Sequence, residues 1–192
     1  MAGKDASGVE TAWGFGFIMP GNRLTPRDHP RIFFTADELR KRLADQSETE
    51  KKMLDGIIPG PDRLKNVNVS EIQENTNLND AALTGGPFAK TIGGYNWGAP
   101  INSLTSIIES GSLRYAFAGD EAAGQKAKEA LLKLCAFKRW NHPWQLARGN
   151  WMYYPVGYTI GPVAMGYDLL YTLLSEADKK AVRDGLMDKG FK

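Results

Sequence analysis

Residues 160–186 constrain the fold most, because they read as two amphipathic helices joined by almost no linker. In the first helix, apolar residues recur every three or four positions and therefore share one face. These residues are Ile160, Val163, Ala164, Tyr167, Leu170, Tyr171 and Leu174. Ser175 and Asp178 have the spacing of a capping box, which predicts that a second helix begins at Ser175. Such a hairpin buries its apolar stripes against other helices, so we expect an all-α fold. Pro162 either starts the first helix or kinks it.

A second hairpin is predicted around Gly119 and Asp120. Pro100 suits the first turn of a helix that ends at Gly119, and Asp120 is placed to cap the next helix. That next helix is expected to bury its apolar stripe, which consists of Ala123, Ala127, Ala130, Leu131 and Leu134. Its charged residues Glu121, Lys126, Lys128 and Lys133 are expected to face water. Cys135, the only cysteine, lies on the apolar side and is expected to be buried rather than reactive.

The N-terminal third is less regular. Residues 1–30 are rich in Gly and Pro and predict an extended arm, so we place the helical domain at residues 31–192. Thr35 and Glu38 form a capping box, which predicts a helix running to about Leu54.

The segment that follows this helix has a different composition. Pro59, Gly60 and Pro61 stop any helix, and residues 66–96 are polar and rich in Asn. We interpret residues 66–96 as a long surface excursion with short helical turns. Residues 32–34 could form a short extended segment, and no other strand is expected.

Composition excludes several classes of protein. The 24 basic and 22 acidic residues leave a net charge of +2, so neither nucleic acid nor an anionic membrane is expected as a partner. No run approaches the ~20 apolar residues that span a bilayer, and the apolar run 13–19 is too short for a signal peptide. His29 and His142, the only histidines, are far apart in sequence, so no zinc site or other cofactor is expected.

The strongest local signal for function is the aromatic and amide-rich segment 139–155. Aromatic rings stack on sugar rings, amides bridge hydroxyl pairs, and an Arg can hold a carboxylate in two-point contact. The candidate sugar-binding residues are Trp140, Asn141, His142, Trp144, Arg148, Asn150, Trp151 and Tyr154. This mixture favours an acidic oligosaccharide or polysaccharide as partner. The alternative is that these aromatic residues close one end of a helical bundle.

A second candidate cluster lies in residues 93–100. Tyr95, Asn96 and Trp97 directly precede a predicted helix N-terminus, where exposed amides attract anions. The alternative is an ordinary loop with Trp97 tucked under the helix.

Two further side chains have both a chemical and a structural interpretation. His142 could shuttle a proton near neutral pH, although the following Pro143 favours a fixed turn. Asp168 could line a groove, but a structural contact is the favoured interpretation. The histidines needed for a Ser-His-Asp triad are absent from the sequence.

Three segments resemble a known family of enzymes. They are HPRIFFTADELRKRL from His29, YAFAGDEAAGQKAKEALLKLCAFKRWN from Tyr115, and GYDLLYTLLSEADKKAVRDGL from Gly166. In this order and spacing they resemble the N-terminal region of heparinase II/III-like and alginate-lyase-like polysaccharide lyases.

The resemblance implies a fold, a reaction and a location. It implies antiparallel helix hairpins that form part of an incomplete (α/α) toroid, with the rest of the toroid and a β-sandwich following in the whole protein. The family cleaves uronic-acid polysaccharides by β-elimination, and its members are periplasmic or secreted. Its catalytic Asn, His and Tyr motifs usually follow the third segment, so no catalytic residue can be assigned and these 192 residues are expected to be inactive alone. His142, Tyr154 and Tyr158 are the weakest of candidates for such a role.

Two alternatives remain open. The chain could be a non-catalytic helical module that binds carbohydrate, with its tryptophans as the platform. A toroidal glycoside hydrolase is disfavoured because no pair of acids stands out beside segment 139–155.

Overall fold

The computed structural model describes residues 3–4, 10–11, 29–60, 62–75, 97–146, 149 and 154–191. Within these residues the fold is all-α, as the sequence predicts. The one exception is a two-residue antiparallel ladder between β1 (Gly3–Lys4) and β2 (Glu10–Thr11), which the sequence did not indicate.

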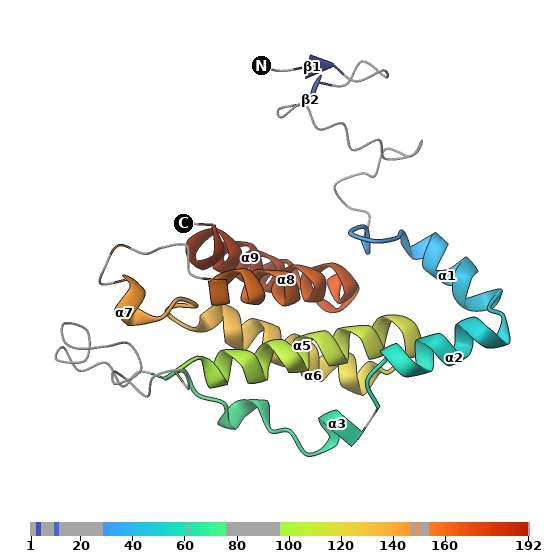
Figure 1. Cartoon of the computed structure of the whole chain (residues 1–192), viewed down its shortest axis with the longest axis horizontal. Helices are drawn as coiled ribbons and strands as arrows, with labels where there is room; N and C mark the ends of the chain where they lie inside the picture. The colour runs from blue at the N-terminus through green and yellow to red at the C-terminus, as the bar shows by residue number, and fades with distance from the viewer. Residues whose placement is uncertain are drawn as a thin grey trace.

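Four helices form the packed body of the structure (Figure 1): α5 (Ala99–Ala118), α6 (Glu121–Ala136), α8 (Tyr154–Leu169) and α9 (Glu176–Gly185). α5 packs along α6 and against α8, while α6 also packs against α9. The two predicted hairpins therefore lie against each other, and the main hydrophobic core fills the space between them.

The α5–α6 turn confirms the prediction. Gly119 ends α5 in the left-handed conformation (φ 65°), which favours glycine because it has no Cβ. The Asp120 side chain accepts a hydrogen bond from the Ala123 N–H and so caps α6. The predicted apolar stripe of α6 is buried, and Cys135 is buried beside it.

The prediction for the charged face of α6 is partly wrong. The Nζ atoms of Lys126, Lys128 and Lys133 donate to the backbone carbonyls of Leu64 (2.6 Å), Leu173 (2.9 Å) and Ser70 (2.7 Å), respectively. The long lysine side chains extend across the helix surface, so their ammonium groups reach these carbonyls. These lysines therefore tie other segments to α6, whereas Glu121 is exposed as expected.

The α8–α9 hairpin begins earlier than predicted. α8 starts at Tyr154, so Pro162 lies inside the helix rather than at its start. A 3-10 turn, η4 (Tyr171–Leu173), links α8 to α9. The Ser175–Asp178 capping box is present and confirms the predicted start of α9. A short π-helical turn, η5 (Leu186–Gly190), continues from α9.

The predicted single helix after Thr35 is wrong, because it consists of two helices. α1 (Ala36–Ala44) has the expected Thr35–Glu38 capping box, and a second capping box at Ser47 starts α2 (Glu48–Ile57). Neither helix contains a buried residue. Residues 32–34 contain bends rather than a strand.

Three short helices connect these elements. α3 (Asp62–Lys65) and η1 (Val69–Glu71) pack against α5 and α6, respectively, and bury Leu64 and Val69. α7 (Pro143–Leu146) lies between α6 and α8.

Candidate functional site

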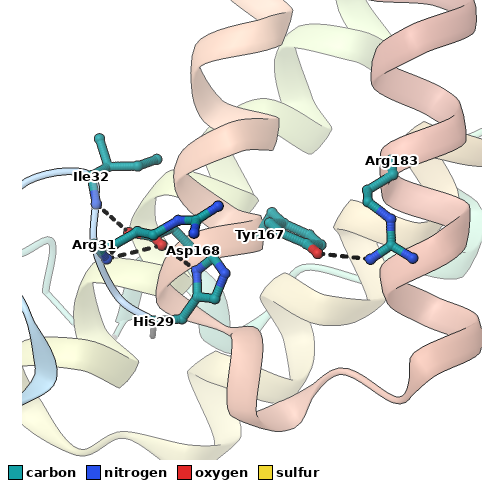
Figure 2. Close-up of polar contacts among 6 residues, drawn as sticks. All are labelled: His29, Arg31, Ile32, Tyr167, Asp168 and Arg183. Carbon is teal, nitrogen blue, oxygen red and sulfur yellow. Dashed lines mark hydrogen bonds and ion pairs between the residues drawn. The ribbon is translucent and has the colours of Figure 1, made fainter. Parts of the chain in front are cut away.

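Asp168, near the C-terminal end of α8, holds the segment that enters α1 (Figure 2). Its Oδ1 lies 2.5 Å from His29 Nδ1. The Arg31 N–H donates to both carboxylate oxygens, at 3.0 and 2.8 Å, and the Ile32 N–H donates to Oδ2 at 2.9 Å. One carboxylate thus satisfies three donors that lie more than 130 residues away along the chain.

The ion pair at this junction is buried. The side chains of His29 and Asp168 are each 4% exposed. A buried carboxylate is stable only when hydrogen-bonded donors compensate its lost hydration, and here three donors do so. Asp168 therefore anchors the N-terminal segment, which agrees with the structural interpretation favoured from the sequence.

Three rings pack beside the carboxylate. The imidazole of His29 stacks on Tyr171 with 3.8 Å between ring centroids, and Tyr167 meets it edge-on at 5.7 Å. Tyr167 and Tyr171 also contact each other edge-to-face at 5.5 Å. Such contacts fix ring orientations as well as burying apolar area.

Two cations of α9 complete this cluster. Lys179 Nζ lies 3.8 Å from the Tyr171 ring centroid and 2.8 Å from a carboxylate oxygen of Glu176. Arg183 Nη1 donates to Tyr167 Oη at 3.0 Å, and this hydrogen bond raises the pKa of Arg183. We refer to His29, Tyr167, Tyr171, Lys179 and Arg183 as the ring–cation cluster.

The accessible chemistry of the ring–cation cluster is anion binding. Arg183 is exposed, and its guanidinium carries more N–H donors than its bond to Tyr167 uses. A guanidinium beside a phenol hydroxyl can bind a carboxylate or sulfate through two hydrogen bonds. The buried His29–Asp168 pair is instead closed off and serves as support.

Four of the predicted sugar-binding residues are buried, so the prediction that they line an open groove is wrong. The residues Trp97, Trp140, Asn141 and His142 are 4%, 1%, 5% and 3% exposed. Trp97 and His142 pack edge-to-face with 5.2 Å between ring centroids. Trp97 and Trp140 are instead part of the main hydrophobic core.

Trp140 shows the physical reason. Its Nε1–H donates at 3.0 Å to the Leu134 carbonyl near the C-terminal end of α6, and the same oxygen accepts the Phe137 N–H at 3.2 Å. Its ring packs within the main core. An indole that both caps a helix end and fills the core presents no face to a sugar.

Burial lowers the pKa of His142, so we expect a pH-dependent loss of stability. The unfolded chain takes up a proton below about pH 6.5, while the folded imidazole stays neutral to lower pH. The free energy of unfolding should therefore be greatest above this pH and fall as the pH drops through the folded pKa. Urea titrations at several pH values should show a shallower decline for His142→Gln than for the parent chain. An unchanged decline would contradict this assignment.

For the other predicted sugar-binding residues, the structure does not describe the side chains. Tyr95, Asn96, Arg148, Asn150 and Trp151 lie outside the described residues. Trp144 lies in α7 and Tyr154 is the first residue of α8, but neither side chain is among those described. The Tyr158 side chain on α8 is described, and the residue is 74% exposed.

Other candidate chemistry can be assessed directly. Burial raises the pKa of the Cys135 thiol to about 12, so it is not a reactive thiolate at neutral pH. The described residues contain no group of three His, Cys, Asp or Glu side chains that could hold a metal ion. None of the helices in the described part of the chain is long and apolar enough to cross a membrane.

The local sequence pattern does not predict the ring–cation cluster. Tyr167 and Tyr171 have the spacing of apolar stripe residues, and His29 lies in the segment expected to be an extended arm. The available signal was that HPRI and GYD both belong to the segments that carry the family resemblance. Nothing in their local patterns indicates that residues 29 and 168 meet.

Comparison with known proteins adds no relative. No protein family, curated protein or solved structure matches the chain.

Proposed function

We propose that this chain is the N-terminal scaffold portion of a polysaccharide lyase that cleaves uronic-acid polymers by β-elimination. Its helix hairpins would form part of an incomplete (α/α) toroid. The groups that remove the C5 proton and protonate the departing glycosidic oxygen would lie outside these residues. The chain's own contribution is shape and binding of the acidic polymer.

The observation that carries this proposal is that the three segments of family resemblance contact one another. Asp168 of the third segment binds His29 of the first. Tyr115 Oη of the second lies 3.1 Å from Thr172 Oγ1 of the third, and Lys128 Nζ lies 2.8 Å from Asp178 Oδ2. Segments that resemble a family for reasons of shared architecture are expected to pack together in this way.

The binding role falls on the exposed edge of the ring–cation cluster. With Trp97 and Trp140 buried, Arg183 and Tyr167 are the described side chains best suited to a uronate carboxylate. Arg183 is exposed, and its hydrogen bond to Tyr167 Oη uses one of its five N–H groups. An exposed contact of this kind contributes little energy alone, so binding would depend on several sugar units.

Two measurements test the proposal. The 192-residue chain should bind alginate, heparin or polygalacturonate in affinity electrophoresis without producing the ultraviolet absorbance of an unsaturated uronate. The protein expressed from the reading frame extended beyond Lys192 should produce that absorbance on at least one of these polymers. Neutral dextran serves as the control polymer.

The variant Arg183→Gln should weaken binding of the acidic polymer about fivefold, since about 1 kcal/mol is the upper range for an exposed ion pair. Lys180→Gln, on the same helix, is the matched control and should bind like the parent chain. Strong turnover by the 192 residues alone contradicts the scaffold role. Binding without turnover by the extended protein supports the alternative, a non-catalytic carbohydrate-binding module.

A further inference from the structure

A pocket of about 300 Å³ lies where the segment entering α1 meets the α5–α6 turn and the end of α8. The residues of its lining that matter here are Leu39, Tyr115, Glu121, Asp168, Tyr171 and Thr172. This volume is at the lower end of the ~300–1,000 Å³ typical of small-molecule sites. It suits a ligand the size of a side chain or a single sugar rather than a polymer chain.

The walls of this pocket are held in place before any ligand arrives. Asp168 is fixed by its three donors, and Tyr171 lies between the His29 ring and Lys179 Nζ. The hydroxyl groups of Tyr115 and Thr172 form a hydrogen bond, with 3.1 Å between Oη and Oγ1. A site with fixed walls loses little conformational entropy on binding.

The charge of the pocket is negative. The carboxylate of Asp168 is already matched by His29 and two backbone N–H groups. Glu121, at the first turn of α6, lines the same pocket and has no ion-pair partner among the described residues. The uncompensated carboxylate disfavours a uronate here and favours a cation.

We propose that this pocket binds a small primary amine. The ammonium group pairs with Glu121, and its remaining N–H groups reach the hydroxyl pair of Tyr115 and Thr172. The carbon body of the ligand rests on the apolar wall that includes Leu39. This site is separate from the proposed polymer-binding edge at Arg183 and does not depend on the lyase assignment.

The test is a titration of the 192-residue chain, followed by NMR through the amide signals of Gly119 and Thr172. The probes are n-butylamine and glucosamine, with N-acetylglucosamine and glucose as uncharged counterparts. Saturable shifts with either amine, weakened by added salt, are the expected result. Binding of glucosamine alone identifies an amino sugar as the source of the ammonium group, and binding of butylamine alone identifies a free alkylamine.

Two variants separate charge from shape. Glu121→Gln should weaken amine binding about fivefold, the upper range for an exposed ion pair of about 1 kcal/mol. Glu129→Gln, an exposed acid on the same helix but outside the pocket, should leave it unchanged. Equal binding of N-acetylglucosamine, no saturable binding of either amine, or full affinity in Glu121→Gln would each overturn the proposal.

Discussion

Asp168→Ala is expected to lower the free energy of unfolding by about 3 kcal/mol. The substitution leaves three part-buried donors, His29 Nδ1 and the N–H groups of Arg31 and Ile32, without their acceptor. It also removes the clearest attachment of the segment that leads into α1. Urea unfolding measures the loss. Hydrogen exchange should show that amides of α1 and α2 lose protection first, because these helices bury no residue of their own.

Two controls accompany the Asp168 prediction. Asp168→Asn keeps one carbonyl acceptor and should cost less than alanine, since only the charge and one strong acceptor are lost. Asp184→Ala removes a surface pair with Lys180, whose side chain is 70% exposed, and should cost under about 0.5 kcal/mol. An Asp168→Ala protein as stable as the Asp184→Ala protein would show that the anchor contributes nothing.

Gly111→Ala should destabilise the chain by about 2 kcal/mol, although alanine is the better helix former. A Cβ at Gly111 in α5 would lie 2.5 Å from the Ala123 carbonyl oxygen and 2.7 Å from Ala127 Cβ, both in α6. A backbone oxygen cannot move aside as the end of a flexible side chain can, so the two helices would have to separate. Thermal and urea unfolding of the variant measure the effect.

The matched control for Gly111 is Gly56→Ala in α2, where nothing lies within 4 Å of the added Cβ. There only the helix preference remains, and a gain of about 0.5 kcal/mol is expected. Equal effects of the two substitutions would mean that close α5–α6 contact does not limit stability.

Local capping signals predicted several helix ends, although the sequence predicted neither the start of α8 nor the break between α1 and α2. The capping boxes at Thr35 and Ser175, the left-handed Gly119 and the Asp120 cap all occur as expected. Each of these caps is formed by atoms only a few residues apart, so the local sequence is enough to predict it. The Ser47–Glu50 box follows the same rule, since its two residues have capping-box spacing in the sequence.

For Trp140, Asn141 and His142, the sequence pattern did not distinguish a groove-lining position from a buried one. A tryptophan beside amides has the same sequence pattern whether it lines a groove or closes a bundle. Trp140 can be buried because its indole N–H donates to the buried Leu134 carbonyl. Burial of this kind depends on which residues from distant parts of the chain pack against the side chain.

By itself, the sequence determined that the body of the described structure is helical, where its main hairpin turns lie and which face of α6 is apolar, because helix periodicity and capping act over a few residues. Only the tertiary structure decided that Asp168 binds residues 29–32, that Trp97 and Trp140 are buried, and that Glu121 shares a pocket with Tyr115 and Thr172. Those contacts join segments up to 139 residues apart. Their energy comes from desolvation and hydrogen bonds that exist only once the helices have packed.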